Sequence, residues 1–291
     1  LTLVLAVLTL LRLLRSIYFT KRIASGFTAG ANGARIARWN GFSWQIALFL
    51  GPVAFTLTPR PEWLAVGALF LAAAMVYAPK GKAPIVDADS LPEISSSARL
   101  REAFRSFRNA GTAYRMWGTD AVVTLFVGIG TLYPPLLERS GIDPVAFGWV
   151  KGAFALGSAV ICLGVRNAWI ENHGAFLFRV SLLGVGLGTL LFPGLSSLGA
   201  FTAVAFLVGV CDGVSVLVRD YALLRAFSGR PMGAISGVTL LMISVADDLG
   251  DFQSGVVSRL IGLTAAVRLG GIVSVGAGLL IRVGAFRPLG S

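Results

Sequence analysis

The segment Leu198–Val218 reads LGAFTAVAFLVGVCDGVSVLV, and Asp212 is its one charged residue. An α-helix needs about 20 mostly apolar residues to cross the hydrocarbon core of a bilayer, and this segment supplies them. Lipid offers no partner to a free backbone N–H or C=O group, so a crossing segment must be helical. Comparable stretches recur along the chain of 291 residues, and they predict an all-α polytopic membrane protein with about nine crossings, at Leu1–Thr20, Gly41–Leu57, Trp63–Ala78, Trp117–Leu137, Val145–Val165, Ala175–Phe192, Leu198–Val218, Met232–Gly255 and Leu263–Ile281.

Composition and charge agree with this fold class. The chain is 55% hydrophobic and 13% charged. Its net charge of +11 could suggest a nucleic acid partner, but threading the chain through nine crossings sorts its basic residues by side. Most of the 25 Lys and Arg fall on one side, and the minority side holds Arg60, Arg139, Lys151, Arg259 and Arg268. Cytoplasmic loops carry such an excess. We therefore expect a multi-pass protein of the cell membrane (plasma or inner) with a cytoplasmic C-terminus, basic residues that contact lipid headgroups, and no nucleic acid partner.

A long polar interval divides the chain into three parts. Residues 1–79 hold three crossings, residues 80–116 form a cytoplasmic linker, and residues 117–291 hold a bundle of six crossings. Within the linker, Arg99–Ala110 spaces Leu100, Ala103, Phe104 and Phe107 at helical intervals among arginines. This pattern predicts an amphipathic helix on the cytoplasmic face of the membrane. A solvated linker helix without a role at the lipid surface is the alternative.

Three acids near the end of the eighth predicted crossing are the chemical feature that points most directly to a functional site. Met232–Ala246 is too short to span alone, so the helix must continue through Asp247, Asp248 and Asp251. At helical periodicity these side chains lie within an arc of roughly 100° and predict an inward polar stripe. Carboxylates in such a position require protons, cations or a wet cavity. We consider them proton-binding or substrate-binding candidates; the alternative is a helix mouth that opens into extracellular water.

Four other residues in or beside apolar stretches stand out, and two of them, Asp212 and Arg12, have two interpretations each. Asp212 is a candidate coupling or substrate-binding acid, or else it pairs with an arginine and holds helices together. Arg12 is a candidate substrate contact, or its side chain extends to the membrane surface. Asp120 lies one turn into its predicted helix, where an acid complements the helix N-terminus. Trp117 is placed to anchor the same helix at the membrane interface.

Several segments carry a resemblance to a known family. Arg12 occupies the place of an arginine early in a fourth helix, and Arg35–Gly41 resembles the basic turn before a fifth helix. Gly51–Pro52 matches the centre of a fifth-helix motif of exporters, although Ala47 stands where that motif begins with glycine. Gly233–Gly255 resembles a glycine-punctuated eleventh helix. With its plan of three plus six crossings, the chain resembles the major facilitator superfamily without its first three helices.

The resemblance implies a secondary active transporter. Such a protein would move a small organic solute by alternating access, with proton coupling and a lean toward efflux, and would act as a monomer. Cys162 and Cys211 lie in separate apolar stretches and predict neither a disulfide nor a metal site. We therefore expect protons and a solute as partners, and no cofactor.

Two other classes of protein stay open. Asp247-Asp248-Leu249-Gly250-Asp251 spells the Asp-Asp-x-x-Asp pattern of intramembrane prenyltransferases that use magnesium diphosphates. That chemistry needs a second acidic cluster, because two or more Mg²⁺ ions clamp the diphosphate, and the sequence offers none. The remaining alternative is a non-transporting or truncated membrane paralogue.

Overall fold

The computed structural model describes residues 96–165, 167–227 and 232–281. These residues form helices and contain no strand. The elements are α4 (Ser96–Arg108), α5 (Thr112–Phe126), η2 (Ile129–Leu132), α6 (Tyr133–Arg139), η3 (Pro144–Ala146), α7 (Phe147–Gly164), α8 (Asn167–Leu191), η4 (Phe192–Gly194), α9 (Leu198–Ala226), α10 (Met232–Ile261) and α11 (Leu263–Leu280). Each of the six stretches predicted as crossings after residue 116 is helical in the structure, but α10 is not among the described segments that are long and apolar enough to span a membrane.

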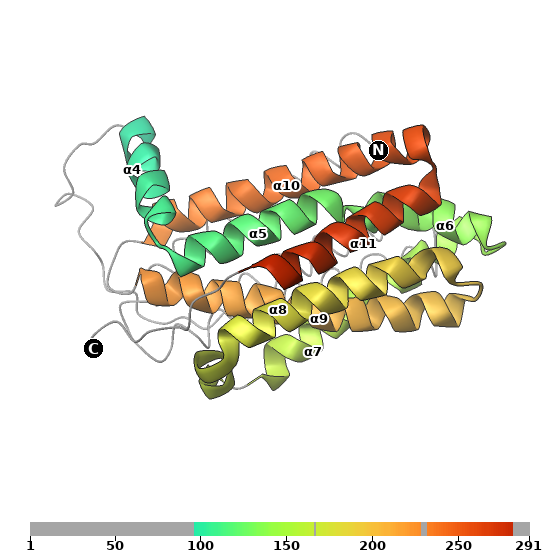
Figure 1. Cartoon of the computed structure of the whole chain (residues 1–291), viewed down its shortest axis with the longest axis horizontal. Coiled ribbons are helices and arrows are strands. Elements are labelled where there is room, and N and C mark those ends of the chain that lie inside the picture. Colours follow the sequence, from blue (N-terminus) through green and yellow to red (C-terminus); the bar gives the residue numbers. More distant parts are fainter. Residues whose placement is uncertain (1–95, 166, 228–231, 282–291) are drawn as a thin grey trace, which may run out of the picture.

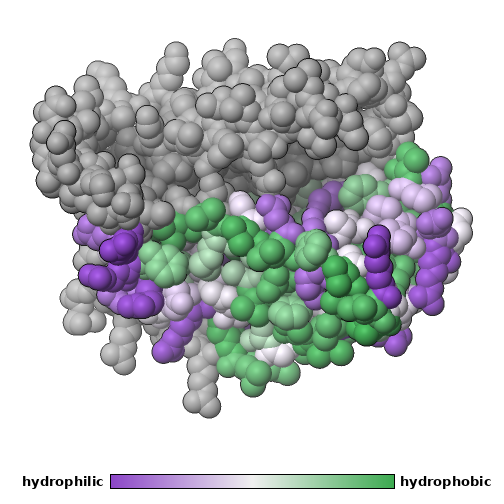
Figure 2. Space-filling model, turned by 90° about the horizontal axis from the view of Figure 1, so that it is seen from above, coloured by the Kyte–Doolittle hydropathy of each residue, from purple (hydrophilic) through white to green (hydrophobic). Residues whose placement is uncertain are grey.

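The long helices lie roughly along one axis, and α4 crosses one end of the bundle (Figure 1). Hydrophobic residues form a band across the middle of the described surface in Figure 2, with hydrophilic residues concentrated at both ends. Five described segments are long and apolar enough to cross a membrane, namely Thr112–Arg139, Pro144–Cys162, Trp169–Gly194, Leu198–Leu223 and Leu263–Leu280. Together these features indicate a membrane-embedded helical bundle. The three crossings expected within residues 1–79, with Arg12 and Gly51–Pro52, lie outside the described residues.

Small residues let the helices pack closely. The most extensive contacts pair α7 with α9, α8 with α11 and α8 with α9, and α5 packs against α10. At the crossing of α5 and α10, a Cβ atom added to Gly250 would lie 2.8 Å from the carbonyl oxygen of Thr124. Helices in lipid associate through van der Waals packing, which small residues at the crossing points favour. The glycine therefore brings the backbone of α10 directly against that of α5.

The first crossing of this bundle is broken in the middle. The sequence predicts one helix over Trp117–Leu137, but α5 ends at Phe126 and the 3₁₀ helix η2 separates it from α6. Pro134 and Pro135 lack the N–H groups that would bond to the preceding turn, so an unbroken α-helix cannot form there. The chain therefore leaves α-helical geometry between Phe126 and Tyr133, where Val127 and Gly128 are non-helical and η2 follows.

The predicted amphipathic helix is present as α4, but its apolar face packs on the bundle. Ala103 and Phe107 are buried in a cluster with Trp117 of α5 and with Ile235 and Val238 of α10. Phe104, on the same helix, is half exposed. Part of the apolar face is thus covered by protein rather than by lipid or solvent. The next helix, α5, begins at Thr112, inside the interval assigned to the linker.

Candidate functional site

The acids of α10 lie within a continuous helix. α10 runs from Met232 to Ile261, so Asp247, Asp248 and Asp251 are interior helical residues and do not belong to a loop, as the sequence predicts. Asp247 is partly buried, whereas Asp248 and Asp251 are exposed. Asp212 is a partly buried residue in the middle of α9.

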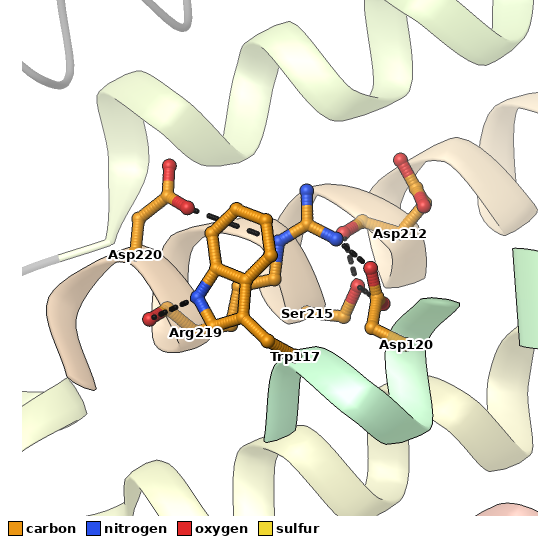
Figure 3. A network of polar contacts seen from close by, with 6 residues as sticks. All are labelled: Trp117, Asp120, Asp212, Ser215, Arg219 and Asp220. Carbon is orange, nitrogen blue, oxygen red and sulfur yellow. Dashed lines mark hydrogen bonds and ion pairs between the residues drawn. The ribbon is translucent and has the colours of Figure 1, made fainter. Parts of the chain in front are cut away.

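A buried ion pair joins α5 to α9. Arg219 Nη1 contacts Asp120 Oδ2, and both residues are less than a tenth exposed. Ser215 Oγ donates a hydrogen bond of 3.4 Å to Asp120 Oδ1. The Arg219 guanidinium lies 4.3 Å from the centre of the Trp117 ring, and Trp117 Nε1 donates a 3.3 Å hydrogen bond to the Arg219 carbonyl (Figure 3). The guanidinium is therefore held by a carboxylate on one side and by an aromatic face on the other.

This geometry corrects two expectations. Asp120 does not cap a helix N-terminus, because α5 begins at Thr112 and places Asp120 in its interior. Trp117 is buried against Arg219 instead of anchoring the helix at the membrane interface.

A second group of charges surrounds Lys151 of α7. The Lys151 ammonium lies within electrostatic range of Asp212 on α9 and of Asp251 on α10. Asp251 also interacts with the hydroxyl and the backbone of Thr131 in η2. A Cβ atom placed on Gly130 would lie 3.4 Å from Lys151 Nζ and 3.8 Å from Asp251 Oδ1. The break between α5 and α6 therefore brings the chain of η2 close to both charged side chains.

The two groups are electrostatically connected. Asp247 acts on both Asp212 and Arg219, so it links the neighbourhood of Lys151 to the buried pair. We call these residues together the charged cluster, which comprises Asp120 of α5, Lys151 of α7, Asp212 and Arg219 of α9, and Asp247 and Asp251 of α10. Asp248 is exposed and influences the cluster through Asp251. The four acids and two bases come from four different helices.

The cluster suits the handling of protons and of charged solutes. Charged side chains in an apolar bundle are costly unless they pair or meet water, and those that persist commonly mark ion or substrate pathways. Arg219 Nε is buried and makes no hydrogen bond, and it lies 3.8 Å from Asp220 Oδ1 in an ion pair. Among residues 96–165, 167–227 and 232–281, no group of three His, Cys, Asp or Glu side chains is arranged to hold a metal ion.

Sequence reasoning identified Asp212, Asp247 and Asp251 but missed the roles of Asp120, Lys151, Ser215 and Arg219. One available signal was spacing. Asp212, Ser215 and Arg219 recur at i, i+3 and i+7, which places them on one face of a helix. The partnership with Asp120 has no local signal, because it joins residues far apart in the chain. Arg12, the remaining candidate, lies outside the described residues.

Comparisons with models of protein families, with curated proteins and with solved structures found no match to this chain.

Proposed function

We propose that this chain belongs to a secondary active transporter of the major facilitator type, which moves a small organic solute by alternating access and couples that movement to protons. The observation that carries the proposal is the charged cluster. Six ionisable side chains from four helices act on one another in a bundle whose face in Figure 2 carries a hydrophobic band across its middle. Maintaining them there is costly, and proton or substrate handling is the usual reason for such residues in a membrane protein.

Helix packing supports the same class of protein. α5, α7, α9 and α10 supply the cluster, whereas α8 and α11 pack closely against one another along their length. Gly186 of α8 and Gly271 of α11 meet at that contact, where an added Cβ on Gly186 would lie 2.7 Å from the Gly271 carbonyl oxygen. The charged cluster is thus confined to four helices, and α8 and α11 contribute no residue to it.

Lys151 provides a way to couple a proton to a change of contacts. It is shared between Asp212 and Asp251, which lie on different helices. A proton on Asp212 would neutralise that carboxylate and leave Lys151 attracted chiefly to Asp251. Loss of the proton would restore the attraction to α9. The broken crossing beside Gly130 and Thr131 supplies backbone that can adjust as these attractions change.

The net negative charge of the charged cluster favours a cationic solute. Asp120, Asp212, Asp247 and Asp251 are opposed by Lys151 and Arg219, so the carboxylates outnumber the cations. We do not propose the prenyltransferase alternative, since Asp247 interacts with Asp212 and Arg219 while Asp251 interacts with Lys151 and Thr131.

Flux measurements in proteoliposomes test the proposal. The full chain is reconstituted into vesicles that hold a pH-sensitive dye, and uptake of the organic cation ethidium is compared with uptake of the organic anion sulfanilate under an imposed pH gradient. We expect gradient-dependent movement of ethidium that falls to the level of empty vesicles in Asp212→Asn and Asp251→Asn. Glu138→Gln, an exposed carboxylate of α6 outside the cluster, is the matched control and should behave as wild type. Uptake that ignores the gradient, or that survives both substitutions, contradicts the proposal.

A further inference from the structure

A groove of about 570 Å³ lies at the end of the bundle where α10 turns into α11. Arg139 of α6 forms one side, and the beginning of α11 forms the other. Its lining includes Arg139, Ile261, Thr264, Arg268, Leu269 and Ile272. None of these residues belongs to the charged cluster, so the groove is a separate feature of the molecule.

Local geometry explains why the groove forms here. Gly262 has φ +88°, a conformation that favours glycine, and it connects α10 to α11 with no longer loop. α11 therefore starts directly beside the end of α10. Arg139 Nη1 donates a hydrogen bond to Thr264 Oγ1, which orients the guanidinium across the groove. Arg268 follows Thr264 by one helical turn, so it lies on the same face of α11.

The lining combines positive charge with apolar surface. Arg139 and Arg268 are both exposed, and the lining contains no acidic residue. Ile261 and Ile272 are more than half exposed, although both are large and apolar. Exposed apolar residues of this kind beside cationic groups at the end of a membrane crossing are typical of the lipid interface.

We propose that this groove binds the headgroup of an anionic phospholipid. The phosphate would lie between the guanidinium groups of Arg139 and Arg268, whose planar donors suit a phosphate better than an ammonium group does. The acyl chains would continue over Ile261, Leu269 and Ile272 into the membrane. The headgroup supplies the negative charge that the lining lacks, and the acyl chains cover its apolar part. This assignment is independent of transport.

Lipid titration of the purified full chain tests the assignment. In a neutral detergent, the apparent Tm is measured as phosphatidylglycerol, phosphatidylcholine or inorganic phosphate is added. A ligand that binds the folded state raises Tm in a concentration-dependent manner. We expect phosphatidylglycerol to raise Tm at concentrations where phosphatidylcholine and inorganic phosphate have little effect. Each hydrogen bond to a charged group contributes about 1.5–3 kcal/mol, so Arg268→Gln should weaken the apparent affinity for phosphatidylglycerol about tenfold or more.

Arg259→Gln is the matched control, because Arg259 is an exposed arginine near the same end of α10 and does not line the groove. It should leave the phosphatidylglycerol response close to wild type. Thr264→Val, which removes the hydrogen-bond acceptor that orients Arg139, should weaken binding without a change of charge. Equal responses to the two lipids, an equal response to inorganic phosphate, or an equal loss in Arg259→Gln would each overturn the proposal. The last outcome would mean that basic residues attract anionic lipid through their general charge.

Discussion

Arg219 of α9 pairs with Asp120 of α5 inside the bundle, although the two residues are far apart in the sequence. The pair is completed by the Trp117 ring below the guanidinium and by the Ser215 hydroxyl beside the carboxylate. A charge removed from such a pair leaves its partner buried and uncompensated, which is far more costly than the absence of both charges.

Loss of one member of this pair should therefore destabilise the protein more than loss of both. Asp120→Leu or Arg219→Met alone should lower the free energy of unfolding by about 3–5 kcal/mol, because each leaves one buried charge without its partner. The double variant should recover much of that loss. Denaturant unfolding monitored by tryptophan fluorescence measures all three, and Arg115→Gln, at an exposed position of α5, is the control. Additive effects in the double variant would show that the two charges are not coupled.

The two faces of α10 should differ in access to water. Asp251 belongs to the charged cluster, whereas Leu241, Val245 and Phe252 form an exposed apolar stripe on the same helix. We expect Asp251→Cys to react with a charged, membrane-impermeant thiol reagent. Phe252→Cys should react slowly, because its exposed side chain meets lipid.

The labelling is performed on the reconstituted protein with Cys162 and Cys211 replaced by alanine, and modification is followed by mass spectrometry. Ser254→Cys is a buried control, since Ser254 is 4% exposed. Rapid reaction at both 251 and 252 would mean that this part of α10 lies in water on all sides, and would argue against an inward polar stripe.

The contact between α5 and α10 should not tolerate a larger residue at Gly250. An added Cβ there would lie 2.8 Å from the Thr124 carbonyl oxygen and 2.9 Å from that of Leu125, so the helices must separate. We expect Gly250→Ala to lower stability by about 1–3 kcal/mol, the usual cost of overpacking. Gly255→Ala is matched in helix and residue type but has nothing within 4 Å of the added Cβ. It should be neutral or stabilising, since alanine favours helix more than glycine does. Thermal unfolding in detergent distinguishes the two, and equal effects would contradict the close contact.

Two phenylalanines of α4 provide a test of how that helix is held. Phe107 is fully buried against α5 and α10, whereas Phe104 is 50% exposed. Phe107→Ala should cost about 3–5 kcal/mol, as expected for a large buried aromatic side chain. It should also increase proteolytic cleavage within Ser96–Arg108, because α4 would detach from the bundle. Phe104→Ala should change the cleavage rate little. Similar cleavage in both variants would show that α4 is not docked through Phe107.

The sequence predicted the helices better than their ends. Long apolar runs such as Leu198–Val218 must form helices in lipid, and each of the later runs does so in the structure. The predicted helix ends were less accurate, because they were placed where the sequence turns from apolar to charged residues, and a helix can continue past that point. α9 extends past Arg219 to Ala226 for this reason, and α5 begins before Trp117. Pro134 and Pro135 indicate the break in the first crossing, but the prediction gave more weight to the continuous apolar run around them and expected one helix.

By itself, the sequence determined that this chain forms apolar helices and that α10 continues through a group of carboxylates instead of ending before them. Both properties follow from local composition and from the requirement that backbone groups be satisfied within lipid. Only the tertiary structure decided which charges meet. Asp120 with Arg219, and Lys151 with Asp212 and Asp251, are brought together by helix packing around small residues. Pairing between helices depends on rotation and crossing geometry, which arise from contacts between distant segments and leave no periodic signal in either segment alone.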